Sequence, residues 1–115
     1  MVLTPLPPTY VSQILNGEIS VEVTSKKHIP LLLELGARRG WILRNHFILH
    51  YEGDAQLAPL LDALRQMGVA FLSVPHGWPP SAIFDLLREK GLLVGECTRV
   101  TFTENGPQVI SHSDQ

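Results

Sequence analysis

Four residues of one short segment form the best candidate for a ligand-binding site: His76, Gly77, Trp78 and Ser81. The imidazole of His76 could serve as an acid, a base or a ligand, and Trp78 could form a flat apolar wall. Ser81 could bind an anion together with the N-terminus of the helix that we expect there. In the alternative interpretation the segment is structural, with Trp78 covering the core and Ser81 capping the helix.

Other residues capable of chemistry form no recognisable constellation. His46 and His50 lie in an apolar, extended stretch, which separates them by about 13 Å, too far to chelate one metal ion. The single cysteine, Cys97, follows Glu96 and is expected to be an inert, partly buried thiol. Glycine-rich phosphate loops and a G-x-S-x-G motif are absent. The sequence therefore implies no catalytic residue, metal or cofactor, and favours a protein that is not an enzyme.

The elements around the candidate segment would place it at the end of a sheet. Residues 69–74 are almost continuously apolar, which is typical of a central strand covered on both faces. A helix is expected from Pro80 to Gly91. In open α/β sheets, ligands bind beyond the carboxyl ends of the strands. The sequence therefore predicts that any ligand site lies between this strand and this helix.

The composition indicates one globular domain. The chain has 115 residues, 44% of them hydrophobic, and a formal net charge of -2. These values exclude disorder of the whole chain and a generic nucleic-acid coat, and one cysteine excludes a disulfide framework. We expect a single domain over residues 1–115, with frayed ends at 1–7 and 111–115.

The N-terminal residues and the length of the apolar runs indicate the cellular location of the protein. Prolines 5, 7 and 8 interrupt the N-terminal apolar residues, and no lysine or arginine precedes them, unlike a secretory signal. No apolar run approaches the roughly 20 residues that a membrane span requires. We therefore expect a cytoplasmic protein with no membrane association.

Four segments share one pattern, in which a proline begins a helical stretch, a glycine ends it and apolar residues follow. Proline suits the first turn of a helix, and glycine suits the position just after its last turn. The pattern predicts helix–strand order repeated four times. The helical stretches are Pro8–Gly17, Pro30–Gly40, Pro59–Gly68 and Pro80–Gly91.

Two predicted strands alternate polar and apolar residues, so that one face of each is expected to contact water. They are 19–23, with Ile19, Val21 and Val23 apolar, and 99–103, with Val100 and Phe102 apolar. The fold class predicted is α/β (or α+β), a two-layer sandwich of about four strands with helices mainly on one face. Because so small a domain leaves surplus apolar surface, we expect a homodimer to cover it.

Charge is uneven along the chain, and residues 52–115 hold four basic against eight acidic residues. This balance disfavours contacts with phosphates, so a nucleic acid is not the expected partner.

The stretch Arg88–Leu93, followed by Thr98–Gly106, resembles the end of a winged-helix domain. There a recognition helix closes on Lys-Gly-Leu, and a two-stranded wing follows. The resemblance implies nucleic-acid binding by residues 81–106.

The function predicted is that of a small intracellular α/β module of unknown specific role. It would act by protein–protein contacts, with itself as a homodimer or with another protein. Two alternatives stay open: a small-ligand, anion-binding or enzymatic site at His76–Ser81, and winged-helix-like nucleic-acid binding by residues 81–106.

Overall fold

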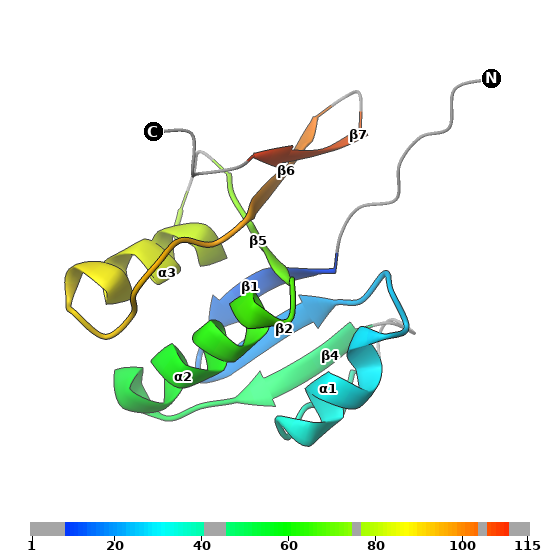
Figure 1. Cartoon of the computed structure of the whole chain (residues 1–115), viewed down its shortest axis with the longest axis horizontal. Coiled ribbons are helices and arrows are strands. Elements are labelled where there is room, and N and C mark those ends of the chain that lie inside the picture. Colours follow the sequence, from blue (N-terminus) through cyan, green and yellow to red (C-terminus); the bar gives the residue numbers. More distant parts are fainter. Residues whose placement is uncertain (1–8, 41–45, 75–76, 104–105, 111–115) are drawn as a thin grey trace.

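The computed structural model describes residues 9–40, 46–74, 77–103 and 106–110, which form a sheet-rich α+β fold (Figure 1). These residues contain seven strands and three helices. In chain order they are β1 (Tyr10–Leu15), β2 (Glu18–Glu22), α1 (His28–Glu34), β3 (Arg38–Arg39), β4 (His46–His50), α2 (Gly53–Gln66), β5 (Ala70–Leu72), α3 (Pro80–Glu89), β6 (Arg99–Thr103) and β7 (Gly106–Ile110).

The seven strands form one mixed sheet in the order β3-β4-β2-β1-β5-β6-β7. β1 pairs antiparallel with β2, β2 with β4 and β4 with β3, and β6 and β7 form an antiparallel hairpin. β5 runs parallel to both β1 and β6. A three-residue strand therefore joins the N-terminal strands to the C-terminal hairpin.

The prediction of a two-layer sandwich of about four strands, with helix–strand order repeated four times, is wrong. The described part of the first expected helix, Pro8–Gly17, is strand β1 followed by a turn. Asn16 and Gly17 have φ of +54° and +80°. Two successive residues with positive φ are typical of a two-residue β-hairpin turn, for which Asn-Gly is a favoured pair. Gly17 thus turns a hairpin rather than ending a helix.

The other three expected helices exist, but with different bounds and surroundings. α1 ends before Gly36, which has φ of +98°, and the expected helix is replaced there by a turn and the two-residue strand β3. α2 and α3 are each followed by a glycine with positive φ, Gly68 and Gly91, as predicted. The apolar residues after α3, 92–94, are not a strand, because the next strand begins only at Arg99.

The main core lies between one face of the sheet and the helices. Val11, Val21 and Phe47 pair across β1, β2 and β4 and are buried. They belong to one apolar cluster with residues of all three helices, including Leu32, Leu61 and Phe84. The helices lie on the same side of the sheet (Figure 1).

A buried polar cluster connects β1, α1 and α2 beside this core. Nδ1 of His28 lies 2.8 Å from Oγ1 of Thr9, and Nε2 lies 3.1 Å from the carbonyl oxygen of Met67. Both His28 and Thr9 are buried. These bonds fix the start of α1 against the end of α2.

Residues 81–106 hold most of α3, all of β6 and the first residue of β7, so a helix precedes a hairpin, the order that the winged-helix resemblance implies. However, the hairpin is the end of the seven-stranded sheet, and β6 pairs parallel with β5. No helix among the described residues is long and apolar enough to cross a membrane. The ends expected to fray, 1–7 and 111–115, lie outside the described residues.

Candidate functional site

The described residues of the predicted ligand site, Gly77, Trp78 and Ser81, lie in different environments. His76 lies outside the described residues. Gly77 is exposed with φ of +73°, and the Trp78 side chain is 71% exposed. Ser81, by contrast, is 1% exposed and is the second residue of α3, whose N-cap is Pro79 with no side-chain cap. Trp78 therefore does not cover the core, and Ser81 does not cap the helix.

The β6–β7 hairpin carries a different surface, which follows from strand alternation. Arg99 points to the helix side of the sheet, because its guanidinium bonds the carboxylate of Asp85 on α3 at 2.6 Å. Successive strand residues point to opposite faces, so Val100 and Phe102 point away from the helices. Val109 pairs with Val100 and shares this outer face.

Five uncharged side chains on this outer face form what we call the apolar strip: Tyr10, Leu72, Val100, Phe102 and Val109. Leu72 pairs with Val100, and the rings of Tyr10 and Phe102 meet edge to face, with centroids 5.3 Å apart. Val100 is fully buried yet does not belong to the main core. The strip is therefore a second, smaller apolar cluster on the opposite side of the sheet.

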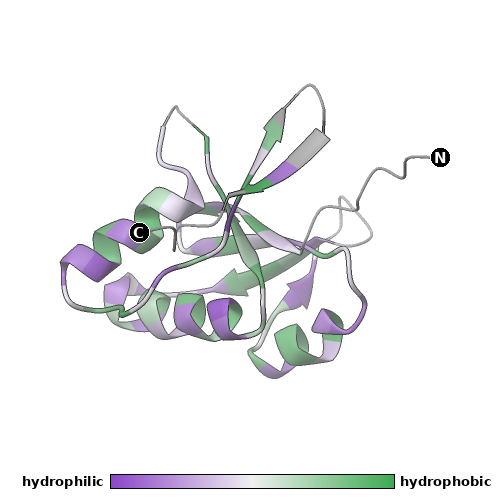
Figure 2. Ribbon diagram, turned by 45° about the horizontal axis from the view of Figure 1, so that its top comes forward, coloured by the Kyte–Doolittle hydropathy of each residue, from purple (hydrophilic) through white to green (hydrophobic). Residues whose placement is uncertain are grey.

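Two members of the apolar strip face solvent. Phe102 is 46% exposed and Val109 is 56% exposed. The hairpin projects from the body of the molecule, away from α1 and α2 (Figures 1 and 2), and Figure 2 shows hydrophobic positions along it. Exposed apolar side chains that share one face are typical of a protein-interaction surface.

The alternation in β6 is recognisable in the sequence, and Val100 is buried as expected, but the exposure of two other residues differs from the expectation. Arg99, expected to be wet, has a side chain only 12% exposed, and Phe102, expected to be covered, is among the exposed hydrophobic residues. The acidic Asp85 on α3 is the signal that could have identified the helix side, because a partly buried arginine needs a carboxylate partner.

Ion pairs hold the loop between α3 and β6. Arg88 lies 3.4 Å from the other oxygen of Asp85 and 3.9 Å from Glu96, and it donates a hydrogen bond to the carbonyl of Gly95. Asp85 thus binds two arginines, one from its own helix and one from β6. This network ties the hairpin to α3 from the side opposite the apolar strip.

Cys97 lies beside this network in a buried environment that disfavours its thiolate. Burial raises the pKa of its thiol to about 11, with Arg99 opposing the rise and Asp85 adding to it. A thiol with so high a pKa is protonated at neutral pH and unreactive. The thiol, expected to be inert and partly buried, is almost fully buried.

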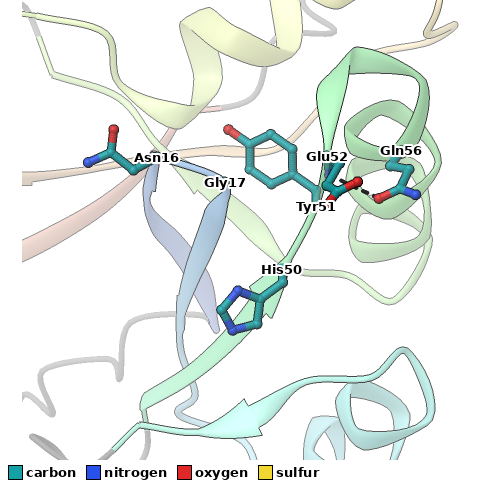
Figure 3. Close-up of a pocket in the computed structure, with 6 residues that line it drawn as sticks. All are labelled: Asn16, Gly17, His50, Tyr51, Glu52 and Gln56. Carbon is teal, nitrogen blue, oxygen red and sulfur yellow. Dashed lines mark hydrogen bonds between the residues drawn. The ribbon is translucent and has the colours of Figure 1, made fainter.

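A cavity of about 420 Å³ lies where the β1–β2 turn meets the junction of β4 and α2 (Figure 3). Its lining is polar: Asn16, Gly17, His50, Tyr51, Glu52 and Gln56. His50 lies 3.8 Å from the carboxylate of Glu18, and the backbone N–H of Glu52 donates to Gln56 Oε1 at 2.9 Å.

This cavity is open and its groups are largely exposed, so it lacks the desolvated setting in which acid–base chemistry is efficient. Within the described part of the chain, no group of three His, Cys, Asp or Glu side chains could hold a metal ion. A smaller cavity of about 210 Å³ lies between α2 and the loop after α3, lined by Ala58, Pro59, Asp62, Leu92, Leu93 and Val94.

No family model, curated protein or solved structure matches the chain. Its function must therefore be inferred from the geometry of its own surfaces.

Proposed function

We propose that this chain is a small protein-interaction module that associates with a second copy of itself through the apolar strip. The observation that carries the proposal is the joint exposure of Phe102 and Val109 on the sheet face away from the helices. Burying apolar area is the main favourable contribution to protein association.

The exposed part of the strip is small beside the roughly 800 Å² that each partner buries in a standard stable complex. Self-association should therefore be weak and depend on protein concentration. A dissociation constant between about 1 μM and 1 mM is expected, which corresponds to roughly 4–8 kcal/mol of binding free energy.

Sedimentation velocity over this range tests the proposal with a matched pair of variants. The double variant Phe102→Ser/Val109→Ser should remain monomeric at concentrations where the unmodified chain dimerises. Leu31→Ser/Leu33→Ser on α1 is the control, because those side chains are similarly exposed, at 42% and 52%. A monomeric unmodified chain at about 1 mM, or equal loss of dimer in both variants, would overturn the proposal.

The two other functions receive less support from the geometry. In residues 81–106 each cationic side chain is paired with a carboxylate: Arg88 with Asp85 and Glu96, Arg99 with Asp85, and Lys90 with Asp54. Paired cations contribute little to phosphate binding, which disfavours nucleic-acid recognition.

A ligand site at His76–Ser81 would need its side chains to converge. Trp78 is exposed and Ser81 is buried, and neither lines either of the two cavities described.

A further inference from the structure

The mode of self-association can be deduced from the backbone and the charges, given the proposed function on which this inference rests. We infer that the second copy packs face to face on the apolar strip, about a two-fold axis near Val109, and does not extend the sheet by pairing with β7. Both modes would use the same end of the molecule, but only strand pairing needs backbone N–H and C=O groups that face the open side of β7.

Backbone hydrogen bonds show which residues of β7 face its open side. The N–H groups of Phe71 and Ser73 donate to the carbonyls of Thr98 and Val100 at 2.8 Å. Val100 therefore directs its backbone groups to β5, and so does Phe102, two residues on. The residues of β6 that face β7 are Arg99, Thr101 and Thr103.

The partners of those three residues are Ile110, Gln108 and Gly106. Pro107 and Val109, which alternate with them, consequently turn their backbone groups to the open side of β7. Proline has no N–H, so among Gly106–Ile110 only Val109 offers an outward donor. A proline facing outward on a terminal strand is a recognised obstacle to further strand pairing. The open side of β7 is thus poorly suited to a second strand.

The opposite end of the sheet is also a poor site for pairing. Gly40 donates its N–H to the carbonyl of His46, so its backbone, like that of Arg38, faces β4. Only Arg39 turns its backbone groups outward in the two-residue strand β3. Two such strands brought together would also place arginines against arginines, which is unfavourable.

The charges on the outer face of the sheet determine where a two-fold axis can lie, because the axis brings identical surfaces of the two copies into contact. A two-fold axis places each residue near the axis close to the same residue of the partner. On β2 the outer face carries Glu18 and Glu22, which pair with His50 and His46 across the strands. Carboxylates near the axis would repel their copies, whereas the strip carries no charge at neutral pH. The axis therefore passes through the hairpin and not through β2.

Cysteine cross-linking and amide exchange test the geometry on the full chain. Val109→Cys should form an intermolecular disulfide at least ten times faster than Leu33→Cys, a position of similar exposure on α1. The unmodified chain, whose single Cys97 is buried, gives the background. In the unmodified dimer, the Val109 amide should exchange with solvent as fast as in the monomer, because face-to-face packing leaves it without a strand partner.

The outcomes separate this inference from the proposed function. If sedimentation shows a dimer but Val109→Cys and Leu33→Cys cross-link equally fast, the axis is elsewhere and only the inference fails. Protection of the Val109 amide in the dimer would indicate strand pairing and would also overturn the inference alone. A chain that stays monomeric at all concentrations overturns both.

Discussion

The hydrogen-bond pattern around His28 determines the tautomer of a buried side chain. Oγ1 of Thr9 accepts the backbone N–H groups of Thr24 and Ser25 at 3.2 and 3.3 Å. With both lone pairs occupied, the hydroxyl must donate its proton to Nδ1 of His28. Nε2 then carries the imidazole hydrogen and donates it to the Met67 carbonyl. The ring serves as a fixed bridge between two segments of backbone.

Removing this bridge should destabilise the fold. His28→Ala leaves the Thr9 hydroxyl and the Met67 carbonyl without their partner and creates a cavity, at a cost of about 2–4 kcal/mol. His50→Ala, at an exposed position, should cost less than about 0.5 kcal/mol. Urea denaturation of both variants measures the difference, and equal losses would contradict the role assigned to His28.

Cys97 should make stability fall at alkaline pH. Its folded-state pKa, raised by burial to about 11, exceeds the ordinary value of 9.0. The stabilising contribution is complete below pH 9.0 and is lost as the pH rises through 11, a loss on the order of 3 kcal/mol.

The comparison that isolates this effect is the unmodified chain with Cys97→Ala, using the free energy of unfolding from pH 8 to 11. The Tyr10 phenol, whose pKa is raised by burial and by Glu22, titrates in both proteins and cancels. Parallel pH dependences in the two proteins would show that the thiol is not linked to folding.

At the scale of elements, the tight turn between β1 and β2 depends on Gly17. Alanine at this position would have to keep the positive φ of Gly17, and its Cβ would lie 3.2 Å from the carbonyl oxygen of Tyr51. Gly68, after α2, has φ of +89° but open space around the Cβ position.

Comparing the two alanine variants therefore separates conformational strain from crowding. Gly68→Ala should cost about 1 kcal/mol from φ alone. Gly17→Ala should cost roughly 1–2 kcal/mol more, because the hairpin must shift relative to Tyr51. Chemical denaturation gives both values. Identical losses would mean that the turn relaxes without strain.

The elements that sequence could predict are those whose local signals agree with their surroundings. α2 and α3 have apolar stripes, and each is followed by a glycine at the expected place. β1 is not predictable in this way, because Pro8 and Gly17 match a helical pattern, whereas pairing with β2 and β5 decides the outcome. Long-range pairing overrides local preference in strands more than in helices.

The candidate surface was harder to predict than the elements that carry it. The alternation of polar and apolar residues in β6 assigns its side chains to two faces, but it does not indicate which face the helices cover. That choice depends on Asp85 meeting Arg99, a contact between residues of different elements. The second strand of the hairpin, β7, has only Val109 and Ile110 as large apolar residues, too few to indicate a strand.

For the whole molecule, self-association should make thermal stability depend on concentration. If only the folded chain dimerises, raising its concentration well above the dissociation constant stabilises it by mass action. The midpoint of thermal unfolding, Tm, should therefore rise between about 10 μM and 1 mM protein, the range set by the expected affinity.

The double variant Phe102→Ser/Val109→Ser should show a Tm that does not change over the same range, and Leu31→Ser/Leu33→Ser should behave as the unmodified chain. Differential scanning calorimetry at three concentrations makes the comparison. A Tm of the unmodified chain that is independent of concentration would argue against dimerisation.

The place of β5 in the sheet has a consequence for how the chain folds. During synthesis the hairpin β1–β2, α1 and β4 emerge first, but one side of β1 stays unoccupied until Ala70–Leu72 arrives. That short strand is itself stabilised by β6, almost thirty residues later. Parallel pairings between such distant segments form slowly. A nascent chain halted before Arg99 would thus expose the side of β1 and be prone to aggregate, so the C-terminal hairpin completes the fold as well as carrying the proposed contact surface.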